Sequence, residues 1–362
     1  MTYQDRFLSG GGFSHFQGAS GGRAAPGGAG PAGQGRRAVP VAMTVAGSDS
    51  GGGAGIQADL KTFTAFGVFG VSAITAITAQ NTLGVARVDV LDPAMVAEQI
   101  GVVLKDIGAD AAKTGMLANA AIVRTVVRSL QEHGLTRLVV DPVMVAASGD
   151  RLLDPEAVDA VRRELIPHAL ILTPNIPEAE ALTDEPIRSV ADMRRAAREL
   201  VSMGCRWAVV TGGHLAWDPA DAPGTEEALA ALADPVVTVE PDDGQDGGRD
   251  ALQAAAGFAA SPAIPGRWAL DVVYDGRRFT WLKSPFFDTR HTHGTGCTFS
   301  AGITAALALG LDPLDAIIAG KRFVTRAIQY ALDLGHGHGP TNHLLRFSPA
   351  APGGGVRDGA AG

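Results

Sequence analysis

The sequence contains few cysteines, no long apolar run and no concentration of basic residues. Its 362 residues include only two cysteines, Cys205 and Cys297, which cannot form a disulfide framework, so we expect the protein in a reducing cytoplasm. The longest apolar runs, such as Val71–Thr78, are far shorter than the ~20 residues that a membrane helix needs. A formal charge of -8 without a lysine-rich block argues against nucleic acids and anionic membranes as main partners.

Two segments differ in composition from the rest of the chain. Residues 1–37 are rich in glycine and lack the apolar core of a signal peptide, so we expect a disordered leader there. Residues 216–268 are rich in alanine, proline, glycine and acidic residues, which predicts a surface insertion that is at least partly disordered. The remaining chain predicts one domain over residues 38–346 and a flexible tail over residues 347–362.

Strand-like and helix-like segments alternate through the predicted domain. Apolar runs that end at glycine, proline or asparagine indicate strands, and the amphipathic stretches between them indicate helices. This alternation predicts a single α/β domain with a parallel sheet that is covered by helices on both faces. The predicted helices are residues 56–67, 93–107, 119–134, 189–203 and 294–309; the predicted strands are 38–47, 71–78, 110–115, 137–141, 169–175 and 207–213, and a hairpin over 268–284 turns at Asp275-Gly276.

The stretch "AGSDSGGGAGIQADLKT", residues 46–62, is a glycine-rich loop between the first strand and the first helix. Loops at the carboxyl ends of strands build the ligand site of an open α/β sheet, and glycines leave N–H groups free to bind a ligand. The dinucleotide-binding pattern fails because Ile56 stands where its third glycine belongs, and no Gly-Lys-Ser/Thr follows as in a Walker motif. A flexible turn without a ligand is the alternative. Asp59, one helical turn further on, either points back toward the loop or lies in solvent.

The stretch "TRHTHGTGCTFSAGITAALALG", residues 289–310, places two histidines and a cysteine before an apolar helix. A metal site would use His291, His293 and Cys297, but this spacing matches no common zinc pattern and the sequence has no second such cluster. A cysteine nucleophile would need a histidine base within hydrogen-bond reach, and the Gly-Thr-Gly turn leaves the direction of His293 open.

The same stretch also fits an anion-binding helix end. The first N–H groups of the helix lack partners within it and lie at the positive end of its dipole, and Gly294 and Gly296 leave room for a phosphate. The field of the helix is expected to lower the pKa of Cys297. An anion site beside a proton acceptor suits phosphoryl transfer to an alcohol. The structural alternative is a helix cap with a small buried cysteine.

Seven separated motifs resemble, in the same order, those of the hydroxymethylpyrimidine/phosphomethylpyrimidine kinases of thiamine biosynthesis, which belong to the ribokinase-like superfamily. The resemblance covers about residues 40–215 and 270–340. It implies a ribokinase-like α/β domain with a mainly parallel central sheet. The motifs are "AGSDSGGGAGIQADLKT", "AQNTLGV", "KTGML", "DPVMVAASGDRLL", "TPNIPEAEAL", "TGGH" and "HTHGTGCTFSAGI".

The resemblance implies two phosphorylations at one site that use ATP and Mg²⁺. The hydroxymethyl group of 4-amino-5-hydroxymethyl-2-methylpyrimidine is phosphorylated first, and the resulting monophosphate is then converted to the diphosphate. The alternative among enzymes is a vitamin B6 kinase that acts on pyridoxal or pyridoxine. A different class is a non-catalytic ligand-binding protein with the same fold, whereas the failed glycine pattern disfavours an NAD-dependent oxidoreductase. The family also implies a homodimer.

The resemblance implies that four residues contact the pyrimidine, namely Gly47, Asp59, Gln80 and Val143. Gln80 is the most informative of them. Its side-chain amide offers both a donor and an acceptor, which matches an aminopyrimidine edge that carries both. A pyridine ring lacks this edge, so Gln80 separates the pyrimidine kinase from the vitamin B6 kinase. A glutamine that only bonds a loop at the end of a strand is the structural alternative.

The other implied site residues hold the phosphates, the metal ion and the reacting hydroxyl. Cys297 stands where related sugar kinases carry an aspartate base, and a thiolate can accept the hydroxyl proton. Lys321 is as readily a solvated helix residue, and residues 146–150 are placed like a lid that excludes water. The implied sets are Cys297, Gly294 and Gly296 for catalysis; Thr211, Gly213 and Lys321 for the nucleotide; and Asp141, Asn175 and Glu178 for Mg²⁺, largely through water.

Overall fold

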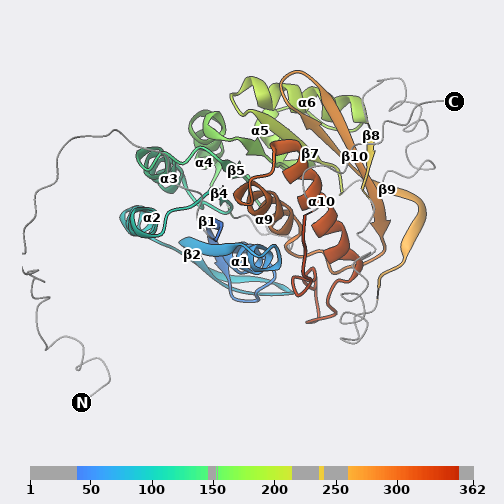
Figure 1. Ribbon diagram of the computed structural model, residues 1–362, viewed down its shortest axis with the longest axis horizontal. Coiled ribbons are helices and arrows are strands. Elements are labelled where there is room, and N and C mark those ends of the chain that lie inside the picture. Colours follow the sequence, from blue (N-terminus) through green and yellow to red (C-terminus); the bar gives the residue numbers. More distant parts are fainter. Residues whose placement is uncertain (1–38, 146–151, 153, 214–235, 240–259, 350–362) are drawn as a thin grey trace, which may run out of the picture. The chain divides into compact units, whose positions relative to one another are not determined.

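The computed structural model describes residues 39–145, 152, 154–213, 236–239 and 260–349, which form a ten-stranded sheet and the helices on its two faces (Figure 1). The predicted leader and lid lie outside the described residues. The strands are β1 (Val41–Asp49), β2 (Phe69–Asn81), β3 (Gly84–Val90), β4 (Ala111–Thr114), β5 (Leu138–Val140), β6 (Ile171–Leu172), β7 (Trp207–Thr211), β8 (Val236–Thr238), β9 (Ala263–Tyr274) and β10 (Phe279–Phe287). The helices are α1 (Gly55–Ala65), α2 (Pro93–Asp106), α3 (Ala120–Glu132), α4 (Pro155–Ala160), α5 (Ile176–Thr183), α6 (Val190–Ser202), α9 (Thr295–Ala308) and α10 (Pro313–Gln329).

The sheet is parallel at its centre, antiparallel pairs flank this centre on both sides, and the edge strand β8 pairs in parallel with β10. Its strand order is β3-β2-β1-β4-β5-β6-β7-β9-β10-β8. The strands from β2 to β7 pair in parallel, whereas β3 pairs antiparallel with β2, and β9 pairs antiparallel with both β7 and β10. The predicted α/β class with a mainly parallel sheet is confirmed. Parallel order brings the carboxyl ends of β1, β4, β5, β6 and β7 to one edge, where ligand sites of such sheets form.

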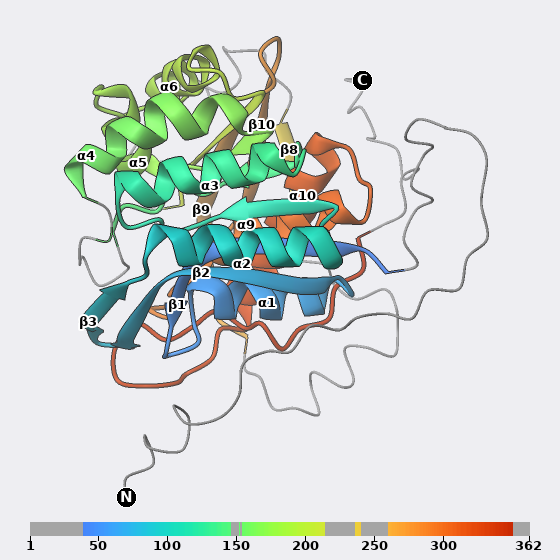
Figure 2. The ribbon, with the colours of Figure 1, turned by 90° about the vertical axis from the view of Figure 1, so that its left-hand side faces the viewer.

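Helices cover the two faces of the sheet unequally (Figure 2). The cluster on one face includes side chains of α2, α3, α4, α5 and α6, and the cluster on the other face includes those of α1, α9 and α10. The sequence of strand β5 is apolar throughout because both of its faces are buried. Leu138 and Val140 pack on the first face, and Val139 between them packs on the second.

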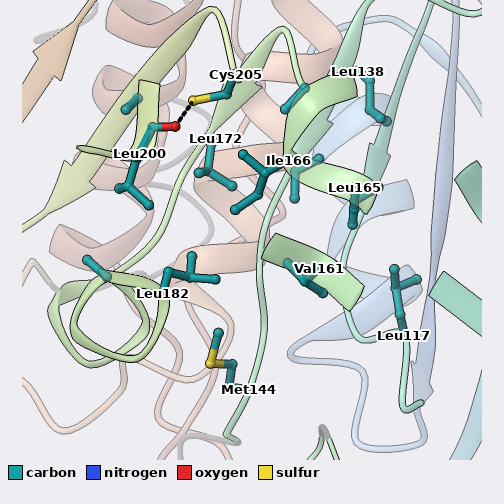
Figure 3. Close-up of a cluster of buried hydrophobic side chains, with 14 of the residues drawn as sticks. Leu117, Leu138, Met144, Val161, Leu165, Ile166, Leu172, Leu182, Leu200 and Cys205 are labelled. Atoms are coloured by element: carbon teal, nitrogen blue, oxygen red, sulfur yellow. Dashed lines mark hydrogen bonds between the residues drawn. The ribbon is translucent and has the colours of Figure 1, made fainter. Parts of the chain in front are cut away.

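Part of the larger cluster lies around the turn that follows α4 (Figure 3). A π-helix (Val161–Leu165) and a 3₁₀ turn (Ile166–His168) continue α4 and place Leu165 and Ile166 among buried side chains of neighbouring elements. Cys205 belongs to the same cluster, and its thiol donates to the carbonyl oxygen of Leu200 over 3.3 Å. Because burial raises the pKa of Cys205 to about 12, this thiol is a structural group rather than a reactive one.

The predicted helices and strands agree with the observed ones to within a few residues. Two N-caps explain the agreement: Asn119 accepts from the N–H of Ile122 at the start of α3, and Ser189 accepts from that of Asp192 at the start of α6. None of the described helices is long and apolar enough to cross a bilayer.

Two predicted boundaries are wrong. Residues 236–238 and 263–268 lie within the predicted insertion, yet they form β8 and the first part of β9. The predicted flexible tail begins with Phe347, which is buried because its ring packs against Phe66 and Phe323 and its N–H donates to the carbonyl of Ala65.

Replacement of Leu165 by alanine should lower the free energy of unfolding by ~3 kcal/mol, because the buried leucine leaves a cavity that its neighbours cannot fill. The control is Leu344→Ala, since Leu344 is 66% exposed and its loss should change stability by no more than ~0.5 kcal/mol. Urea unfolding curves measure both values. Equal midpoints for the two variants would contradict the packing described for this cluster.

Candidate functional site

The predicted site residues gather at the carboxyl edge of the sheet. Asp141 follows β5, Asn175 follows β6 and caps α5, and Thr211 ends β7. Asn175 and Thr211 form a parallel bridge, and the N–H of Thr211 donates to the carbonyl of Pro174. The hydroxyl of Ser300, one turn into α9, donates to Asp141 over 2.9 Å, which places the start of α9 at the same edge.

The glycine-rich loop lies directly against the turn that begins α9. Gly294 is the N-cap of α9 with φ of 81°, and a side chain there would collide with the carbonyl of Gly53. Two segments more than two hundred residues apart therefore meet so closely that glycine is required at their contact.

The structure places His291 and His293 neither as metal ligands nor as a base for Cys297. The ring of His293 donates to Asp49 over 2.9 Å, and the ring of His291 lies 3.3 Å from Asp333. Within the described residues, no group of three or more His, Cys, Asp and Glu side chains is arranged to hold a metal ion. The structure thus supports neither the zinc-like site nor a cysteine–histidine nucleophile pair.

A buried lysine lies at the centre of the site. Lys113 has no exposed side-chain surface, and its Nζ lies 2.8 Å from Asp59 Oδ1 and 3.6 Å from Asp141 Oδ2. The second oxygen of Asp59 accepts from the hydroxyl of Thr44 over 2.6 Å. The three charges come from β4, α1 and the end of β5, so this ion cluster joins a strand to the helix that follows the glycine-rich loop.

Burial is the main cause of the raised pKa values of the carboxylates at the site. Burial raises the pKa of Asp141 above its usual value. Glu178 is buried, and burial together with the negative charge of Asp141 raises its pKa to about 8. Asn175 and Glu178 form a capping box in which each side chain accepts from the backbone N–H of the other.

The expectation that Cys297 has a lowered pKa is wrong for the protein without ligands. Burial raises its pKa to about 12, and the positive charge of Lys113 and the N–H of Gly55 offset this only in part. The negative charges of Asp59 and Asp141 act in the same direction as burial. At neutral pH the group at the start of α9 is therefore a thiol, because a thiolate there lacks solvation and faces carboxylates.

The residues implied for the pyrimidine fall into two groups. Gly47 lies beside Met116 and Ala76, and Val143 packs against the same apolar pair. Gln80 lies at the end of β2, where its Oε1 accepts from the hydroxyl of Thr78 over 3.1 Å.

A direct contact between Asp59 and a ligand finds no support in this geometry. Its side chain has no exposed surface, and Lys113 and Thr44 occupy its two oxygens. Asp59 instead forms a buried ion pair with Lys113.

The residues implied for the nucleotide come from the end of β7 and from α10. Thr211 is half-buried, and Gly213 is exposed with open space beside it. Lys321 of α10 is not solvated: it is buried and donates to Asp271 over 2.7 Å. The other oxygen of Asp271 accepts from the N–H of Gly212, so Lys321 reaches the end of β7 through that carboxylate.

Sequence reasoning missed Lys113 and the contact between Asp49 and His293. Lys113 carried a detectable signal, because a lysine in a strand of four fully buried residues needs an anionic partner. The pairing of Asp49 with His293 carried none, since the two residues are joined only by the tertiary fold.

The sequence matches the family described as phosphomethylpyrimidine kinase over residues 49–244 and 260–342. The chain is 41% identical over 303 residues to the hydroxymethylpyrimidine/phosphomethylpyrimidine kinase of Bacillus subtilis, covering 84% of this chain and 94% of that protein. It is 43% identical over 305 residues to the protein of the same description from Haemophilus influenzae, covering 84% of this chain and 97% of that one.

Two solved structures show the same fold. The ADP complex of Bacillus subtilis pyridoxal kinase superposes with a TM-score of 0.67 at 35% identity, covering 85% of this chain and 98% of that one. The phosphomethylpyrimidine kinase from Clostridium difficile superposes with a TM-score of 0.60 at 37% identity, covering 80% of this chain and 99% of that one. The predicted ribokinase-like fold is confirmed.

Stability should depend on pH through Glu178. Its pKa is 4.5 in an ordinary environment and about 8 in the folded protein, so between these values the folded protein binds a proton that the unfolded chain has released. The free energy of unfolding should therefore fall as pH rises through this interval. Glu178→Gln should flatten that slope in urea unfolding at about pH 5, 6.5 and 8.

The matched control is Glu185→Gln, which removes an exposed carboxylate of the neighbouring loop and should leave the slope unchanged. A parent protein whose stability rises over this interval would show that Glu178 is not protonated in the fold.

Proposed function

Because this chain belongs to the phosphomethylpyrimidine kinase family, we propose that the loops at the carboxyl edge of its sheet bind the substrates of two successive phosphorylations. The protein is an enzyme of thiamine biosynthesis. It uses ATP to phosphorylate the hydroxymethyl group of 4-amino-5-hydroxymethyl-2-methylpyrimidine and then converts the monophosphate to the diphosphate. The observation that carries the proposed location is the open amino end of α9, which lies against the glycine-rich loop and the ion cluster.

Phosphate oxygens are proposed to bind at the first turn of α9. The N–H groups that begin a helix have no partners within it, and the helix dipole favours negative charge there. Gly296 leaves room at this end, because a side chain there would come no closer than 4.0 Å to the carboxylate of Asp141, whereas Gly294 packs directly against Gly53. Thr211 and Gly213, at the neighbouring end of β7, are proposed to contact the rest of the nucleotide.

The pyrimidine is proposed to lie between the apolar pair of Ala76 and Met116 and the end of β2. Gly47 and Val143 line the first side, which suits the flat face of the ring. Gln80 lines an open pocket together with Ser50 and Asn81, and its amide can pair with the donor and acceptor of the aminopyrimidine edge.

The residues at the edge of the sheet fit Mg²⁺. Asp141 and Glu178 are buried carboxylates with raised pKa values, so a cation between them would relieve the charge that now favours protonation. Mg²⁺ prefers such oxygen ligands and keeps several waters. The side chain of Asn175 is engaged in the capping box, so we propose that it acts through water. Bound Mg²⁺ would neutralise charge on the transferred phosphoryl group.

Cys297 is proposed to receive the hydroxyl proton or to support the anion site beside it. The thiol is protonated in the unliganded protein, so it can accept a proton only after losing its own. The positive charge of Lys113 lowers the pKa of Cys297 and so favours loss of this proton.

We also propose that the protein is a cytoplasmic homodimer. Both cysteines are free thiols, as a reducing compartment favours. Exposed apolar side chains concentrate on β2, β3 and α2, where a second copy could cover Ile77, Leu83 and Val90.

A kinase assay of the purified chain with ATP and Mg²⁺ tests the substrate. Hydroxymethylpyrimidine, its monophosphate and pyridoxal are offered in parallel, and we expect the diphosphate to accumulate from both pyrimidines. Pyridoxal kinases share the fold, so slower formation of pyridoxal phosphate is compatible with this function. Pyridoxal phosphate without any pyrimidine diphosphate would instead identify a vitamin B6 kinase.

Replacement of Cys297 by alanine should lower kcat by at least ~10²-fold, the lower range for loss of a general base. The control is Cys205→Ala, which removes the buried thiol remote from the site and should lower stability rather than kcat. Near-normal turnover of Cys297→Ala would mean that the thiol only fills space at the start of α9.

A further inference from the structure

Asp49 and His293 form a buried contact that none of the roles above uses. The Nε2 atom of His293 donates to Oδ2 of Asp49 over 2.9 Å, and the side chains are only 10% and 3% exposed. Asp49 ends β1 and His293 precedes the N-cap of α9. The contact therefore joins the glycine-rich loop to the segment that leads into the first turn of α9, where the phosphates are proposed to bind.

Asp49 fixes the conformation of the glycine-rich loop. Its Oδ1 accepts from the N–H of Gly51 over 2.8 Å, and its Oδ2 accepts from those of Gly53 and Ala54 over 3.1 and 2.9 Å. These charge-assisted bonds and the contact with His293 hold the pKa of Asp49 below its usual value, against the effect of burial. One carboxylate therefore binds three backbone N–H groups of the loop.

His293 is held on its other sides as well. Its N–H donates to the carbonyl of Gly339 over 3.1 Å, and its carbonyl accepts from the N–H of Thr341 over 3.3 Å. Its ring lies against the loop so closely that a side chain at Gly53 would meet Cδ2 at 2.5 Å. The direction of the ring is therefore set by the backbone on one side and by the loop on the other.

We propose that His293 is a positioning residue for phosphoryl transfer: by donating to Asp49, it holds the glycine-rich loop at a fixed distance from the first turn of α9. The inference rests on the proposed function, because it assumes that phosphates bind at the first turn of α9. A shift of about 1 Å in such a site can lower the rate ~10²-fold. The side chains of Gln80 and Val143 do not take part in the contact, so we expect a larger effect on the transfer step than on binding of the pyrimidine.

Two substitutions at His293 separate positioning from packing. His293→Phe keeps a ring of similar size without a donor, and we expect kcat to fall ~10²-fold while KM for the pyrimidine changes less than ~3-fold. His293→Gln carries an amide N–H near the position of Nε2, so kcat should stay within ~5-fold of the parent. His133→Phe, at the end of α3, is the control histidine and should leave kcat unchanged.

A double-variant comparison tests whether the two side chains act together. Asp49→Asn should lower kcat on its own, and the variant with both Asp49→Asn and His293→Phe should be no slower than the slower single variant. Thermal unfolding of each variant shows whether it is folded, and His293→Leu replaces His293→Phe if the phenylalanine does not fit.

The inference is overturned if the variant lacking a donor keeps parental kcat, if His293→Gln loses as much as His293→Phe, or if the losses in the double variant multiply. Failure of the proposed function gives a different result. In that case the parent chain itself forms no phosphorylated pyrimidine, whatever stands at position 293.

Discussion

The buried ion cluster around Lys113 joins four of the elements that meet at the site, namely α1, β4, the end of β5 and α9. Lys113 of β4 contacts Asp59 of α1 and Asp141 after β5, and Asp141 in turn accepts from Ser300 of α9. Removal of one partner from a buried ion pair leaves an uncompensated charge and costs about 3–5 kcal/mol. The glycine-rich loop enters α1 and the phosphate-facing turn enters α9, so the cluster holds both helices against the sheet near their amino ends.

The cluster also determines the protonation states of the site. Burial raises the pKa values of Asp141 and Glu178, and the negative charge of Asp141 raises that of Glu178 further. Burial, and after it the charges of Asp59 and Asp141, keep a proton on the sulfur of Cys297 against the field of the helix. A divalent cation with the nucleotide would reverse this balance, which links the proposed binding of Mg²⁺ to the ability of Cys297 to accept a proton. Dipole reasoning from one helix could not foresee this, because the carboxylates come from other elements.

Most of the fold was predictable from the sequence because its signals are local. Period-2 and period-3.6 patterns and turn residues depend on neighbours in the chain, so the predicted helices and the parallel strands agree with the structure. The failures occurred where local composition was overridden by packing. Val236–Thr238 extend the sheet from an acidic, glycine-rich region by pairing with β10, and Phe347 joins two other phenylalanine rings although its surroundings in the sequence resemble a tail.

The sequence by itself determined the α/β class, the glycine-rich loop, the open start of α9 and, through seven ordered motifs, the family. These depend on residue type and spacing along the chain. Only the tertiary structure decided that Asp59 pairs with Lys113, that Lys321 is buried against Asp271, and that His293 donates to Asp49. The physical reason is that charge pairing and desolvation depend on distances between residues far apart in the chain, and these distances exist only once the sheet has brought its loops together.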